Sequence, residues 1–133
     1  MDGTLEDKAY KIEMTLQGAR NTISVGKGVI RALGCPSHIS LKISDTNDSI
    51  SIFPCDEDNV MSFRVPEKLL VDHHCVMRIF SKKFVQGIMR MNDLDNTKTY
   101  NLVGSYLKAQ NTAVFSLRGG ATLRGKKCED KQE

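Results

Sequence analysis

The sequence predicts a mainly β protein with two short helices, arranged as two similar units within one domain. Three observations support this fold class. Short segments in which apolar and polar residues alternate recur along the chain, and this period of two is typical of half-buried strands. Two other segments carry apolar residues at helical spacing. The order strand, short helix and β-hairpin occurs twice, at roughly residues 21–53 and 76–117.

The first unit begins with two predicted strands. Residues 10–16 alternate Tyr, Ile, Met and Leu with Lys, Glu and Thr, so one face is apolar. Residues 17–21 contain glycine and asparagine and predict a turn. The second strand carries Ile23 and Val25 and stops at Gly26.

A short helix is predicted next. Val29, Ile30 and Leu33 lie at helical spacing, and Gly34 followed by Pro36 is a typical stop signal. Such a helix has about two turns, which is too short to be stable alone in water. It must therefore be held by packing against strands.

A β-hairpin completes the first unit. Residues 39–43 and 50–52 alternate isoleucine or leucine with serine or lysine, and residues 45–48 are typical of a turn. Pro54 ends the hairpin, and residues 56–58 form an acidic loop.

The second unit repeats this order. Residues 61–65 predict a strand that is stopped by Pro66, and residues 75–80 predict another, in which Cys, Met and Ile alternate with Val, Arg and Phe. Ser81 is a typical N-cap for a helix over residues 82–91, which has an apolar stripe.

The remaining segments complete the second unit. Residues 66–71 fit either a helical turn or an irregular crossover. Residues 92–96 end the second helix. Residues 99–107 and 112–117 predict a second hairpin around a turn at residues 108–111.

At 133 residues the chain is the size of one domain. We expect a flexible N-terminus at residues 1–9 and a single domain over residues 10–118. Its two units comprise about residues 10–58 and 59–118. The tail, residues 119–133, has basic and mixed charge and few apolar residues, so we expect it to be disordered.

Composition indicates a soluble globular protein, with 40% hydrophobic and 26% charged residues. No apolar run is long enough to span a membrane, and the first residues do not resemble a signal peptide, so we expect a cytoplasmic location. The four cysteines include no C-x-x-C pair, and we expect them to be reduced. They are Cys35, Cys55, Cys75 and Cys128.

The net charge is +3 and the isoelectric point is about 8.7. This balance is compatible with an anionic partner, but many soluble domains share it. Charge alone therefore does not identify a partner.

The segment after the first turn resembles a known family. It reads ISVGKGVIRALG and is followed by HISLKISDTNDSISIF. This pattern is similar to the swapped-hairpin domain of AbrB-type (SpoVT-AbrB-like) transition-state regulators, in which a strand, a short helix closed by Leu-Gly and a hairpin follow one another. Ile30, Arg31, Leu33 and Gly34 match the helix end, and Gly26 stands where the family has proline.

The resemblance implies an AbrB-like swapped-hairpin β-barrel. In that family one unit is half a barrel, and two units interleave their hairpins to form a shared core. A unit of this size cannot bury enough surface to fold alone. Here the second unit is expected within the same chain, as in MraZ-like proteins, which carry two copies.

The resemblance also implies a transcriptional regulator that binds double-stranded DNA through basic side chains around the strand-to-helix junctions. Such cations contact phosphates and supply affinity with little sequence reading. Two alternatives remain open: the cations serve solubility, or the chain is a non-catalytic protein-interaction module of the same fold that does not bind DNA. The candidate DNA-binding residues are Arg20, Lys27, Arg31, Arg78, Lys82, Lys83 and Arg90.

Four basic residues of the tail suggest a flexible arm along the DNA backbone, although a charged end more often only aids solubility. Whether two copies form a homodimer through an edge strand also stays open. The tail residues are Arg118, Arg124, Lys126 and Lys127.

Catalysis and metal binding are not expected. His73, His74 and Cys75 are the only cluster with metal-ligand chemistry, but adjacent residues of a strand point to opposite faces. No oriented third group for a Cys-His nucleophile is visible, and no Gly-rich phosphate loop is present. We therefore expect no enzyme activity, no metal and no small-molecule cofactor.

Overall fold

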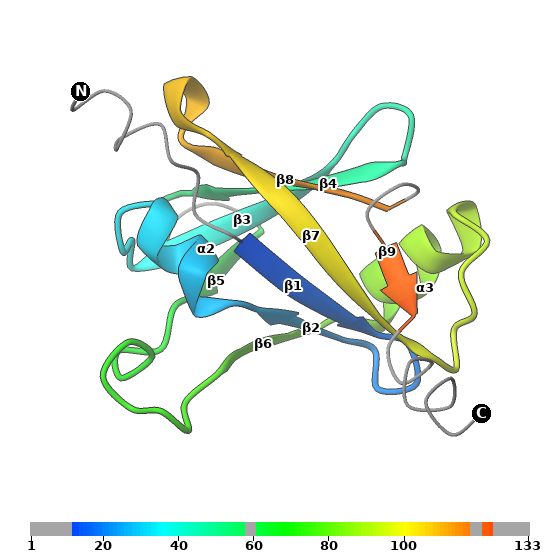
Figure 1. The fold of residues 1–133 in the computed structure, drawn as a ribbon, viewed down its shortest axis with the longest axis horizontal. Helices are drawn as coiled ribbons and strands as arrows, with labels where there is room; N and C mark the ends of the chain where they lie inside the picture. Colours follow the sequence, from blue (N-terminus) through cyan, green and yellow to red (C-terminus); the bar gives the residue numbers. More distant parts are fainter. Residues whose placement is uncertain (1–11, 58–60, 118–120, 124–133) are drawn as a thin grey trace, which may run out of the picture.

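The computed structural model describes residues 12–57, 61–117 and 121–123. The chain forms a mainly antiparallel sheet that curls into a nearly closed barrel, with short helices at its ends (Figure 1). This confirms the predicted fold class at the level of a β-barrel with few helices. The expected flexible N-terminus, residues 1–9, lies outside the described residues.

The first hairpin consists of β1 (Ile12–Gln17) and β2 (Thr22–Val25), which pair antiparallel as predicted. Alternate residues of β1 are fully buried, among them Ile12, Met14 and Leu16, and the residues between them face outward. The turn ends at Asn21, which has a left-handed φ of 53°. Asparagine tolerates this conformation better than most residues.

Helix α2 (Lys27–Ala32) is as short as predicted and begins after an extended Gly26. It ends in a Schellman arrangement, in which the Cys35 N–H donates to the Ile30 carbonyl at 2.9 Å and the Gly34 N–H donates to the Arg31 carbonyl at 3.1 Å. Gly34 has a φ of +88°, a conformation that glycine adopts without steric cost. The predicted stop signal is therefore confirmed.

The second hairpin, β3 (His38–Ile43) and β4 (Ser49–Pro54), is also confirmed. Its turn is held by Ser44, whose hydroxyl donates to Asp48 Oδ1 at 3.0 Å. Pro54 is the last residue of β4 and lies opposite Ile39.

The second half contains β5 (Ser62–Arg64), β6 (Met77–Phe80) and α3 (Lys82–Met91). The hydroxyl of Ser81 accepts a hydrogen bond from the Phe84 N–H at 3.3 Å, which confirms the predicted N-cap. Residues 66–71 form successive turns and no regular helix. The Asp72 N–H donates to the Lys68 carbonyl at 2.9 Å, which is the spacing of one helical turn, so the helical-turn and the crossover interpretations both fit this segment.

The chain ends with β7 (Thr99–Leu107), the 3₁₀ turn η1 (Lys108–Gln110), β8 (Thr112–Ser116) and β9 (Ala121–Leu123). The expectation of disorder over residues 119–133 is wrong for β9, and the rest of that range lies outside the described residues. Since β8 pairs with β7 only from Gly104 onward, residues 100–102 of β7 keep an open edge, and β9 occupies it.

The two halves of the chain interleave. β1 and β2 pair with each other, and their outer neighbours, β7 and β6, both come from the second half. β3 and β4 likewise pair with each other and with β5 and β8. The two hairpins of the first half therefore meet only through β7 and β8, which come from the second half.

The pairing register follows an approximate twofold pattern. β2 and β6 pair through all four of their residues, and β4 pairs with β8 around Ser51 and Val114. The Met14–Leu102 pair of β1 and β7 has its counterpart in the Phe63–Ile39 pair of β5 and β3. The pattern breaks where β5 and β6 end the strand order without pairing, unlike β1 and β2, and where β9 adds to β7.

One core fills the barrel, and both halves contribute to it. Its largest fully buried side chains include Phe115 and Ile50 from the second and first halves. The apolar faces of both helices also close on this core, with Val29 and Ile30 from α2 and Ile88 from α3. The described residues thus share a single interior.

Candidate nucleic-acid interface

The β2–β6 pair carries one strand-to-helix junction at each of its two ends. Val25 lies opposite Met77 at one end, and Thr22 lies opposite Phe80 at the other. Because the strands are antiparallel, α2 begins at the first end and α3 begins at the second. A strand rises about 3.4 Å per residue, so the two ends of this four-residue pair lie about 10 Å apart. Lys27 and Lys82, which begin the helices, each lie two residues beyond one of these ends.

Arg20 lies at the α3 end of this pair. The turn that carries it is fixed to α3, because the Ser81 N–H donates to the Asn21 carbonyl at 3.0 Å. The side chain of Gln86 adds a hydrogen bond from Nε2 to Asn21 Oδ1 at 2.7 Å. Arg20 is therefore held at the end of the pair where Lys82 and Lys83 begin the helix, and all three are exposed.

Lys27 and Arg31 lie at the other end. They are four residues apart in α2 and thus share one face of that helix. Arg31 is exposed, whereas Lys27 is half-buried and its Nζ donates to the Asp72 carbonyl at 2.9 Å. Lys27 is accordingly the less available of the two cations.

Arg78 lies between these two groups. It is an exposed residue of β6 and pairs with Ser24 of β2. Six of the seven predicted cations therefore lie along the β2–β6 pair or at its ends.

Arg90 is the exception. It lies near the end of α3, two turns after Lys83, which is about 10 Å along a helix. There it lines a polar hollow together with Asp93 and Asp95. The structure therefore separates Arg90 from the other candidates and places it beside two carboxylates.

The start of α3 concentrates positive potential. The N-terminal end of a helix carries a partial positive charge, which favours nearby anions and disfavours cations. Lys82 and Lys83 occupy this first turn, and no acidic residue accompanies them there. An anion that approached these lysines would also meet the helix dipole with a favourable sign.

Two apolar residues on the same surface were not among the predicted site residues. The side chain of Phe80 is 73% exposed and that of Val76 is 43% exposed, and both lie on the face of Arg78. The sequence did carry a signal, because Phe80 falls on the polar side of an alternating strand. An exposed aromatic ring beside cations can stack on a base or pack against a protein partner.

The remaining candidates do not form a site. His73 and His74 are exposed, and no group of three or more His, Cys, Asp or Glu residues converges within residues 12–57, 61–117 and 121–123. In that same part of the chain, none of the helices has the length and apolar character needed to cross a membrane. The four basic tail residues lie outside the described residues.

Comparison of the chain with protein-family models, with curated proteins and with solved structures found no match.

Proposed function

We propose that this chain binds duplex DNA through the surface of the β2–β6 pair, as a transcriptional regulator of the AbrB-type swapped-hairpin class. The observation that carries the proposal is the arrangement of six cations along this short strand pair and at its two ends. In this proposal Arg90 makes no contact with DNA.

Two features support the swapped-hairpin part of the proposal. The first half of the chain contributes two hairpins, β1–β2 and β3–β4, and they meet only through the β7–β8 hairpin of the second half. Gly26, which stands at the family's proline position, has a φ of −68°, the value that proline adopts. These features are expected for two interleaved units in one chain.

Each cation has a distinct role in the proposed complex. Lys82 and Lys83 would contact phosphate oxygens at the N-terminus of α3, with Arg20 beside them. Arg78 lies in the middle of the β2–β6 pair at the edge of the sheet, and in this proposal it reaches a base edge in the major groove.

Fluorescence anisotropy with a labelled random duplex tests the proposal. We expect binding at about 50 mM salt that weakens as salt rises, since each phosphate contact contributes a log–log slope of about −0.9. Replacing Lys82 and Lys83 together with alanine should reduce that slope by about two. Lys42→Ala provides a matched control, because Lys42 is an exposed lysine of β3.

Undetectable binding of the wild-type protein at about 50 mM salt would contradict the proposal. So would equal slopes for the wild-type protein and the double variant. Arg78→Ala should weaken binding and also reduce any preference among duplex sequences.

A specific observation favours a second candidate function. Phe80 and Val76 expose apolar area beside Arg78, and a protein-interaction module of this fold would use such a surface. The unpaired edge of β6 could also pair with a second copy of the chain.

Two measurements separate these alternatives. A homodimer would be seen in the mass measured by light scattering, and it should dissociate when Arg78 is replaced with proline. A protein-interaction module would yield a stoichiometric protein partner and no nucleic acid when the chain is purified from cells.

A further inference from the structure

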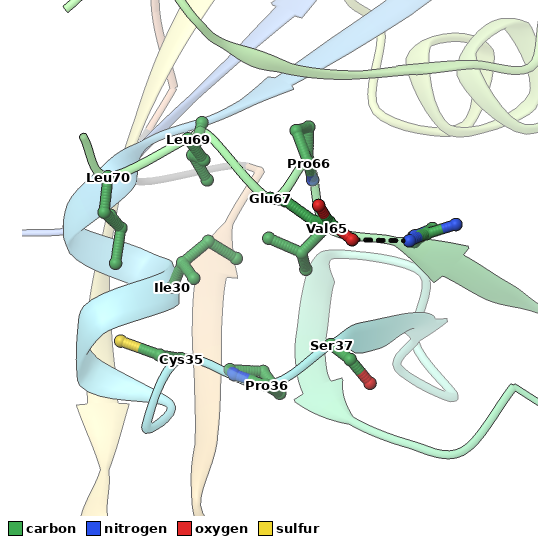
Figure 2. A pocket seen from close by; sticks show the side chains of 10 residues that line it. Ile30, Cys35, Pro36, Ser37, Val65, Pro66, Glu67, Leu69 and Leu70 are labelled. Carbon is green, nitrogen blue, oxygen red and sulfur yellow. Dashed lines mark hydrogen bonds and ion pairs between the residues drawn. The ribbon is translucent and has the colours of Figure 1, made fainter. Parts of the chain in front are cut away.

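A cavity of about 300 Å³ lies between the end of α2 and the segment after β5 (Figure 2). Its apolar walls include Ile30, Val65, Leu69 and Leu70. Ile30, Val65 and Leu69 are buried core residues, so these walls are fixed by the fold. This volume lies at the lower end of the range for small-molecule sites, about 300–1,000 Å³.

The approximate twofold pattern shows why the cavity exists at this position. At one corner of the barrel, β1 of the first half and β7 of the second half pair up to Gln17 and Thr99, and one further bond follows, from the Gly18 N–H to the Lys98 carbonyl at 3.0 Å. Gly18 lies so close to the loop between α3 and β7 that a Cβ atom on Gly18 would be 2.5 Å from the Asn96 carbonyl oxygen. This corner of the barrel is closed by direct contact.

The corresponding corner, where β5 of the second half meets β3 of the first half, is open. There the last bond runs from the Val65 N–H to the Ser37 carbonyl at 2.8 Å. The next residues on the two chains are Pro66 and Pro36, and neither has an N–H to continue the ladder. The chains separate at the two prolines, which both line the cavity.

The mouth of the cavity carries two opposite charges. Arg64 Nη2 lies 2.9 Å from Glu67 Oε2, and the side chains are 70% and 81% exposed. Figure 2 labels Glu67 next to Val65 and Pro66 of the cavity wall. An exposed ion pair contributes only about 0–1 kcal/mol, so a ligand with its own charges can open it at small cost.

We propose that this cavity binds a free α-amino acid with an apolar side chain of about the size of leucine. The carboxylate of the ligand pairs with Arg64, its ammonium group pairs with Glu67, and its side chain enters the apolar cavity. Both polar contacts are charge-assisted hydrogen bonds, which are stronger than neutral ones. A zwitterion is the ligand class that matches adjacent positive and negative groups over an apolar cavity.

Calorimetric titration of the full chain with L-leucine tests the proposal. We expect saturable binding, and affinity that falls at least about tenfold for each of three analogues that lack one feature. These are 4-methylpentanoate, which has no ammonium group, L-leucinamide, which has no carboxylate, and glycine, which has no apolar side chain.

Two variants assign the contacts. Arg64→Gln should weaken binding of both L-leucine and 4-methylpentanoate, whereas Glu67→Gln should weaken L-leucine alone, by about tenfold in each case. Both side chains are mostly exposed, so the fold should be retained. Lys68→Ala is the matched control, since Lys68 is exposed, adjacent in sequence and absent from the cavity wall, and it should bind like the wild type.

The proposal is overturned if L-leucine shows no saturation up to about 10 mM, or if 4-methylpentanoate binds as tightly as L-leucine. Unchanged affinity in both Arg64→Gln and Glu67→Gln would also overturn it. The result is independent of DNA binding, because neither residue is among the cations of the β2–β6 surface.

Discussion

Asp95 fixes the loop between α3 and β7 through one carboxylate oxygen. Its Oδ1 accepts hydrogen bonds from the Thr97 hydroxyl at 2.7 Å and from the Thr97 N–H at 2.9 Å. These bonds, the one from the hydroxyl first, lower the pKa of the Asp95 carboxyl below its ordinary value. The charged form is therefore favoured in the folded protein.

The lowered pKa gives Asp95 a defined pH dependence. A carboxyl whose pKa is lower in the folded state stabilises the fold above its unfolded pKa, about 3.9, and loses this contribution as pH falls through the folded value. We expect Asp95→Asn to lower the free energy of unfolding at neutral pH. Denaturant unfolding at a series of pH values should show the difference from wild type shrinking below about pH 4.

Thr97→Val serves as the second variant for this test. It removes the hydroxyl donor and keeps the backbone N–H, so the pH dependence of stability should be weaker than in the wild type. A gap between wild type and Asp95→Asn that stays constant from neutral to acid pH would contradict the assignment.

At the scale of the element, α3 is capped well but charged unfavourably. Ser81 satisfies one N–H of its first turn, yet Lys82 and Lys83 place two cations at the positive end of the helix. Each such charge costs about 0.3–1 kcal/mol at an exposed helix end. The proposed contact with DNA phosphates is consistent with two lysines at this position.

We therefore expect stability and DNA binding to change in opposite directions when Lys82 and Lys83 are both replaced with glutamate. Thermal unfolding should show a higher midpoint, because the dipole now favours the side chains, and anisotropy should show loss of duplex binding. Lys42→Glu, within β3, should give no comparable gain in stability. A double variant that binds DNA like wild type would remove α3 from the interface.

Most elements could be predicted because their signals are local. The alternation of residues 39–43, the Ser81 cap and the Gly34 stop each depend on neighbours within a few positions. β9 could not be predicted in this way, because Ala121 and Leu123 form a strand only where β7 offers an open edge. That edge is set by where the β7–β8 pairing stops, at Gly104 and Phe115, and not by the residues of β9 themselves.

The candidate interface was predictable only in part, because some of its features depend on local sequence and others on a long-range contact. The cations of the two junctions could be listed from the sequence, and the alternation of residues 75–80 puts Phe80 on the same face as Arg78. The antiparallel pairing of β2 with β6, which gathers six cations and leaves Arg90 beside Asp93, is a long-range contact that no local pattern encodes.

At the scale of the whole molecule, the interleaved sheet makes each half dependent on the other. β2 and β4 find their outer partners, β6 and β8, only in the second half. A chain of about half this length also buries too little apolar surface to be reliably stable.

Fragments divided between residues 58 and 59 should therefore be unfolded when separate. Mixing them should restore the circular dichroism and the amide NMR spectrum of the intact chain, because the strands of one fragment complete the sheet of the other. Cooperative thermal unfolding of either fragment alone would contradict this dependence.

The two corners of the barrel, one closed at Gly18 and one open at Pro36 and Pro66, carry a consequence for how the molecule can vary. An assembly of two identical chains must repeat every substitution at both related positions. A covalent link between the halves removes that constraint. A substitution can then close one corner while the related position in the other corner keeps a different residue. Loss of exact symmetry is thus a freedom that only the joined chain possesses.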